Sequence, residues 1–173
     1  IGRSATTRIN LMMCVKVLFS FAKQRGYLPK QEPTAPEMLK LPKQNNAEVG
    51  LFTPADLERL LRAAPLKLVP LLAIGAFAGL RAAEMARLNW SAVDTNRRII
   101  ELRAGQTKTA SRRLIPISDN LAAWLATVPR EGQVIPHRLR FTQATTLAKS
   151  LGITWPHNAL RHSYISYRIA VVQ

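Results

Sequence analysis

The chain is poor in cysteine. Its one cysteine, Cys14, excludes an intrachain disulfide, and its place in an apolar stretch predicts a buried, unreactive thiol. None of the three histidines has a cysteine nearby at the spacing of a zinc site, so we expect no metal and no cofactor. These features exclude a disulfide-stapled secreted framework and favour a reducing compartment, the cytoplasm.

Acidic and aromatic residues are also scarce. Ten Asp and Glu stand against 25 Lys and Arg, which gives a formal net charge of +15. Such an excess is typical of proteins that bind polyanions, with nucleic acid as the first partner to consider. Aromatics make up only 6% and do not cluster in the basic stretches, which disfavours an RNA-binding module built on base stacking. Double-stranded DNA is therefore the expected partner.

The sequence has no long apolar run. The longest, residues 71–80, is about half the length that a helix needs to cross a bilayer, so we expect no membrane partner. A hydrophobic fraction of 47% in 173 residues is nevertheless ample for a core. The chain has room for one medium domain, or for one domain and a smaller piece.

The sequence predicts a helix over residues 6–26, followed by a segment with four prolines between positions 28 and 50. Because that proline content suits a linker, we expect a boundary near Asn46, with segments 1–45 and 46–173. Position 1 is Ile, and the sequence ends 12 residues after Arg161, so we expect an internal fragment.

The second segment predicts a mainly helical α+β fold with a small antiparallel sheet. Two β-favouring runs flank a polar hairpin at 105–111, and Pro116 restricts the second run to an edge or a strand end. Pro70 should break or kink an otherwise fully buried helix. The expected strands are 98–102 and 114–117, and the expected helices are 53–64, 66–78, 81–88, 118–125, 142–151 and 158 onward.

Three cationic motifs follow one another in this segment. Arg81 lies in Gly-Leu-Arg-Ala-Ala-Glu, Lys108 lies in the polar hairpin, and Arg161 lies in Asn-Ala-Leu-Arg-His-Ser. Two guanidiniums and an ammonium can hold one phosphodiester and neutralise its oxygens during transfer. Arg81 could bind such an anion or could form an ordinary ion pair with Glu84, and both interpretations remain open. Lys108, among other cations, could act as a general acid.

The order of these motifs resembles the catalytic domain of the tyrosine recombinase, or phage integrase, family. Residues 79–90 resemble its first box, residues 107–109 and 113–117 its hairpin, and residues 158–164 its second box. The resemblance implies that Arg81 and Arg161 bind the scissile phosphate, that Glu84 supports Arg81, and that Lys108 protonates the leaving oxygen. Residues 1–45 are similar to the end of the helical core-binding domain, which clamps DNA. Further expected DNA contacts are Thr107, Thr109, Arg112, Arg113, His157 and His162.

Two departures from the family pattern qualify this expectation. Asn158 stands where the family has histidine or lysine, with His157 just outside the pattern. Either Asn158 fills the place with reduced chemistry, since an amide transfers no proton, or a local shift brings His157 in. Tyr164 and Tyr167 do not occupy the nucleophile position, and we expect both to serve in packing. We therefore expect no nucleophile in this chain.

The resemblance implies a piece of a site-specific recombinase of a mobile element, encoded by a bacterium or phage and acting as a homo-oligomer on DNA. Such enzymes break and rejoin strands through a 3′-phosphotyrosyl intermediate, in DNA integration among other reactions. The alternative is a non-catalytic DNA-binding protein with a degenerate integrase fold.

Overall fold

The computed structural model describes residues 4–42, 49–104, 112–135 and 141–172. The chain divides into two compact units, residues 1–48 and 49–173. Each unit is described by itself.

The first unit contains α1 (Ala5–Gln24) and the short α2 (Ala35–Met38). Ser4 caps α1 by accepting the Thr7 backbone N–H. Lys23, near the end of α1, forms an ion pair with Glu37 of α2 at 2.7 Å, and Thr34 donates to the same carboxylate. The hydrogen bond from Lys23, followed by those from Thr34, lowers the pKa of Glu37 to about 2. These contacts fasten α2 to the end of α1.

Helix α1 has no buried residue. The predicted burial of Cys14 is therefore wrong: the thiol is exposed, because in the described part of this unit only α2 lies against the apolar helix. Over the described ranges, α1 is also the one helix that is long and apolar enough to cross a membrane by length and composition, with a mean hydropathy of 1.2. A core helix of a soluble protein passes the same test.

In the second unit, α4 (Val69–Phe77) forms the centre of the core, and α3 (Pro54–Ala63) packs against it. Thr53 caps α3 with its side chain, and α3 buries three leucines. Residues Val69 to Ala76 of α4 are all buried, and α4 packs against α3, α5 (Ala82–Met85), α6 (Asp119–Ala126) and α8 (Ala159–Val172). The expected break near Pro70 appears as the start of the helix: residues 66–68 form a turn, and Pro70 lies in the first turn of α4, where its missing N–H costs nothing.

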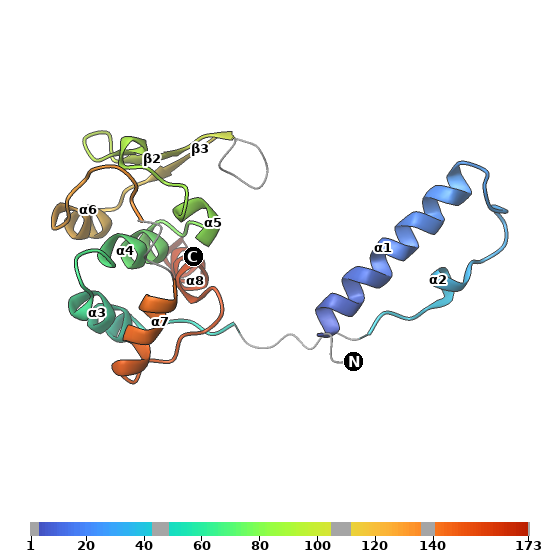
Figure 1. Ribbon diagram of the computed structural model, residues 1–173, viewed down its shortest axis with the longest axis horizontal. Helices are drawn as coiled ribbons and strands as arrows, with labels where there is room; N and C mark the ends of the chain where they lie inside the picture. The colour runs from blue at the N-terminus through green and yellow to red at the C-terminus, as the bar shows by residue number, and fades with distance from the viewer. Residues whose placement is uncertain (1–3, 43–48, 105–111, 136–140, 173) are drawn as a thin grey trace. The chain divides into compact units, whose positions relative to one another are not determined.

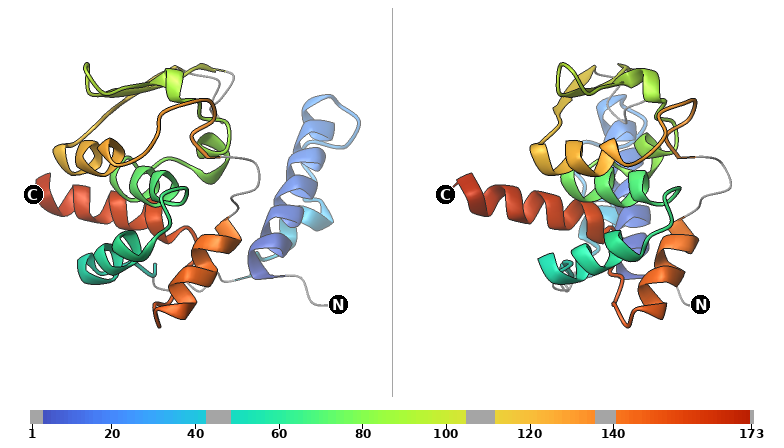
Figure 2. Two further views of the ribbon diagram at one scale, coloured as in Figure 1. Left: turned by 60° about the vertical axis from the view of Figure 1, so that its left-hand side comes forward. Right: turned by 90° about the vertical axis from the view of Figure 1, so that its left-hand side faces the viewer.

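The small sheet lies along one side of this helical cluster in each view (Figures 1 and 2). After the 3₁₀ turn Trp90–Ala92 come β1 (Val93–Asp94), β2 (Ile99–Leu102) and β3 (Arg113–Pro116), antiparallel in the order β1-β2-β3. Buried Ile100 is paired with Ile115, and Leu102 with Arg113. Pro116 ends the edge strand β3, as expected. The prediction of a mainly helical α+β fold with a small antiparallel sheet is confirmed.

Helix α8 is held at two places, and α7 (Phe141–Ser150) precedes it. The Phe52 backbone N–H donates to Ser163 Oγ at 2.8 Å, and the Tyr167 hydroxyl donates to the Phe52 carbonyl at 2.8 Å. At Gly75 of α4 an added Cβ would lie 2.7 Å from Leu160, so glycine permits the close approach of α4 and α8. These contacts fix the helix that carries Arg161.

Candidate functional site

Arg81 stands immediately before α5, and Glu84 lies in the first turn of that helix. The Glu84 carboxylate accepts the Arg81 backbone N–H at Oε2 and the Arg81 Nη1 at Oε1, both at 2.9 Å. Glu84 is only 2% exposed, whereas the Arg81 side chain is 40% exposed. The ion pair with Glu84 therefore forms and still leaves part of the guanidinium accessible to an anion.

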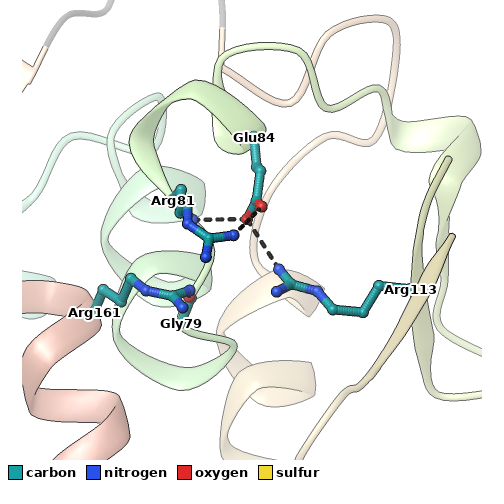
Figure 3. A network of polar contacts seen from close by, with 5 residues as sticks. All are labelled: Gly79, Arg81, Glu84, Arg113 and Arg161. Atoms are coloured by element: carbon teal, nitrogen blue, oxygen red, sulfur yellow. Dashed lines mark hydrogen bonds and ion pairs between the residues drawn. The ribbon is translucent and has the colours of Figure 1, made fainter. Parts of the chain in front are cut away.

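Glu84 also binds a second guanidinium. Arg113, the first residue of β3, donates Nη2 to Glu84 Oε2 at 2.9 Å, so one carboxylate joins cations from α5 and β3 (Figure 3). Its neighbour Arg112 instead pairs with Glu101 of β2 at 2.8 Å. Of these two expected DNA contacts, Arg113 thus lies within the network around Arg81.

The Glu84 carboxylate is ionised at neutral pH. Burial by itself would raise its pKa, but the hydrogen bonds from Arg81 and the charges of Arg113 and Arg81 outweigh burial, so the pKa of Glu84 is lowered. Since the folded pKa lies below the usual 4.5, this carboxylate stabilises the fold above about pH 4.5, and that stabilisation is lost as the pH falls through the lowered pKa.

The substitution Glu84→Gln should remove this pH-dependent term. At pH 7 we expect the free energy of unfolding to fall by about 2 kcal/mol, less than for a fully buried pair because both guanidiniums are partly exposed. Below pH 4 the difference between Glu84→Gln and the unaltered chain should shrink. Urea unfolding at a series of pH values measures this, and a difference that stays constant down to pH 2 would contradict the assignment.

Arg161 projects from α8 toward Arg81. Its Nη1 donates to the carbonyl of Gly79, which lies two residues before Arg81 (Figure 3). Gly79 has φ +61°, and the ring of Tyr164 packs where a Cβ would otherwise lie. Burial, followed by the charge of Arg81, lowers the pKa of Arg161. The two arginines are therefore near enough to repel each other.

Both arginines line a cavity of about 560 Å³. His157 and Asn158 line it as well, each with an exposed side chain. Asn158 has φ +54°, a left-handed conformation that asparagine tolerates better than most residues. The remaining lining is mostly apolar: Leu80, Ala82, Met85, Phe141, Thr145, Trp155, Pro156, Ala159 and Leu160.

Several other predicted residues lie away from this cavity or outside the described part. Thr107, Lys108 and Thr109 fall outside the described residues. His162 is half-buried on α8. Tyr164 packs against Gly79 and Tyr167 donates to Phe52, so both tyrosines have packing roles.

Sequence reasoning missed two contacts of the site, namely those of Arg113 with Glu84 and of Arg161 with the Gly79 carbonyl. The glycine before Arg81 was the available signal for the second contact, since a left-handed turn there presents a carbonyl. No sequence pattern marks the first contact, which depends on how β3 packs beside α5.

Solved structures that this chain resembles include two integrases and a recombinase. The integrase of mycobacterium phage Brujita is 21% identical with a TM-score of 0.58, over 95% of this chain and 58% of that protein. The Tn1549 transposon integrase in complex with circular intermediate DNA is 19% identical with a TM-score of 0.68, over 99% and 68%. XerA recombinase is 20% identical with a TM-score of 0.52, over 71% and 50%. The chain thus spans little more than half of the Brujita integrase.

A comparison with curated proteins gave no significant match. The model of the phage integrase family, however, matches residues 52–164. This range contains Arg81, Glu84, Arg113 and Arg161, together with the cavity residues His157 and Asn158. The chain therefore belongs to the phage integrase family.

Proposed function

We propose that this chain is part of a site-specific DNA recombinase and that its cavity binds the scissile phosphate. One observation carries the proposal: Arg81 and Arg161, far apart in sequence, line the same cavity on rigid supports. Guanidiniums held in place before the ligand arrives are what phosphoryl transfer requires, because most of its catalysis is positioning and charge stabilisation.

The charges around the cavity support an anionic ligand. Arg81, Arg113 and Arg161 bring three positive charges, and Glu84 brings one negative charge, so this cluster is left with a net +2. Bringing cations together in this way has a cost that an anion offsets. A phosphodiester fits this need: it carries one negative charge and gains another as the attacking oxygen adds.

The reaction transfers one phosphodiester twice. A tyrosine hydroxyl attacks phosphorus, the bond to the 5′-oxygen breaks, and a 3′-phosphotyrosyl link forms. A 5′-hydroxyl of the partner strand then attacks this link and releases the tyrosine. Arg81 and Arg161 would neutralise the non-bridging oxygens in both steps, and Lys108 would protonate the departing 5′-oxygen. Tyr164 and Tyr167 would not supply the attacking hydroxyl, because both are engaged in packing.

Covalent capture tests the activity. A longer chain that carries the family's nucleophilic tyrosine is incubated with a nicked duplex, from which the cleaved end diffuses away. A protein–DNA adduct that survives denaturing electrophoresis supports the proposal, and its absence across a set of candidate sites opposes it.

Duplex DNA is the proposed partner, consistent with the charge of +15 and with the Tn1549 integrase having been solved with DNA. We expect the 173-residue chain to bind duplex DNA with an affinity that falls about 10³-fold or more between 50 and 200 mM salt, since binding releases counterions from several phosphates. Fluorescence anisotropy over a salt series measures the slope. Binding that does not depend on salt would contradict phosphate contact.

Because strand exchange joins two duplexes, we propose a homo-oligomer on DNA, acting in the cytoplasm without a membrane partner. The second candidate function is DNA binding without catalysis, on a degenerate integrase fold. Asn158 favours it, because its amide cannot transfer a proton as histidine or lysine can. The capture experiment separates the two, since a binding protein would shift the duplex in a gel and leave no covalent adduct.

A further inference from the structure

Arg113 reaches the site from the sheet and not from the helices. It is the first residue of β3, paired with Leu102 of β2, and its guanidinium extends toward α5 (Figure 3). Its Nε is buried and has no hydrogen-bond partner in the part of the chain that the structure describes, while its Nη2 donates to Glu84 at 2.9 Å. The geometry of this side chain is therefore set by Glu84.

This contact bears on Arg81 through the shared carboxylate. Glu84 Oε2 accepts both the Arg113 Nη2 and the Arg81 backbone N–H, and Oε1 accepts the Arg81 Nη1. The carboxylate is consequently fixed from two elements, α5 and β3. If Arg113 is removed, the side-chain contacts that remain to Glu84 among the described residues come from Arg81 itself, and the pair can move together.

We propose that Arg113 is a positioning residue: by fixing Glu84, it holds the Arg81 guanidinium in the orientation that binds a DNA phosphate. The inference rests on the proposed function, because it takes Arg81 as a phosphate ligand. Arg113 would then affect DNA binding through Glu84 and Arg81, and not through the direct DNA contact that was expected from the sequence.

Arg112 provides a matched comparison: the sequence marks it as a direct DNA contact, and it pairs with Glu101 in place of Glu84. It is the neighbouring residue with the same charge, and it too pairs with a glutamate, at 2.8 Å. Its partner Glu101 lies on β2, and the two side chains are 66% and 35% exposed, whereas Glu84 is 2% exposed. Removal of Arg112 therefore measures the loss of one positive charge near β3 with the Arg81–Glu84–Arg113 contacts intact.

A double-mutant cycle on DNA affinity tests the proposal in the 173-residue chain. The DNA affinity is measured with a fluorescent duplex as the probe. The single variants are Arg113→Gln, Arg112→Gln and Arg81→Gln, and the double variants combine Arg81→Gln with each of the other two. We expect R113Q to weaken binding about tenfold and R112Q about twofold. In the R81Q background, the effect of R113Q should fall to that of R112Q, because no Arg81 guanidinium remains to be positioned.

The proposal is overturned if R113Q and R112Q weaken DNA binding equally and if each of these effects adds to that of R81Q. A different result, in which R81Q costs no more than R112Q, would overturn the phosphate clamp itself. Arg113→Lys keeps a cation beside Glu84 and should bind within about twofold of the unaltered chain, and a loss as large as that of R113Q would contradict the mechanism. Circular dichroism verifies folding, and Arg113→Met, which keeps the apolar stem, replaces R113Q in the cycle if R113Q does not fold.

Discussion

Replacing Arg161 with alanine is expected to reduce covalent DNA capture by at least about 10³-fold in a chain that carries the family's nucleophilic tyrosine. Arg161 is held against the Gly79 carbonyl and lines the cavity with Arg81, so its loss removes one of the two guanidiniums proposed to bind the phosphate. Arg81→Ala should have an effect of the same order. Denaturing electrophoresis of the adduct over time gives the rates.

A surface arginine supplies the control for lost charge. Arg62 of α3 pairs with Glu58 at 2.8 Å, and its side chain is 72% exposed. Arg62→Ala should leave capture within about twofold, because an exposed pair contributes little. If Arg161→Ala also stays within twofold while the protein binds DNA, the cavity is not the reaction site.

Substituting Gly79 with alanine should lower the free energy of unfolding by about 3 kcal/mol or more. A Cβ at this position would lie 2.2 Å from the ring of Tyr164, and the backbone has φ +61°, so alanine adds both a clash and strain. The backbone must also shift at the carbonyl that accepts Arg161. Chemical denaturation measures the stability, and DNA capture by the same variant in the longer chain should fall as well.

Gly132 separates the two causes. It has φ +64°, almost the same as Gly79, but an added Cβ would meet none of the described residues within 4 Å. Gly132→Ala should therefore show only the cost of the left-handed conformation, about 1 kcal/mol. If Gly79→Ala and Gly132→Ala lower the free energy of unfolding equally, the clash with Tyr164 does not contribute to the effect of Gly79→Ala.

Much of the fold could be predicted because local chemistry determines it. Helices were expected from residues 53 and 118, and α3 and α6 begin one residue later because Thr53 and Ser118 cap them with their side chains. Pro116 ends an edge strand, since proline cannot donate to a further neighbour. These features need only a few consecutive residues, so they can be recognised without knowledge of the tertiary structure.

The errors arose where packing decides the outcome. Cys14 was predicted to be buried because its neighbours are apolar, but burial depends on what covers a helix, and only α2 does so among the described residues of that unit. The helix predicted from residue 66, with a break or kink near Pro70, begins only at Val69, because residues 66–68 form a turn before it. Both predictions inferred a three-dimensional environment from one-dimensional composition.

For the site, the sequence predicted a set of residues but not how they are arranged. The pairing of Arg81 with Glu84 could be expected from their three-residue spacing. The contact of Arg113 with the same carboxylate could not, because it joins residues 29 apart through the packing of β3 beside α5. The choice between Asn158 and His157 for the histidine place is likewise not decided by spacing, since both line the cavity.

The central claim is that Arg81 and Arg161 bind one phosphate together. Nuclear magnetic resonance of the guanidinium groups in the ¹⁵N-arginine-labelled chain tests it most directly, with signals assigned from Arg81→Lys and Arg161→Lys and duplex DNA added in steps. We predict that both signals shift with the same apparent Kd, and that either lysine substitution weakens the response of the other arginine. Saturation of the DNA complex with neither signal shifted, or with only one, would contradict the claim.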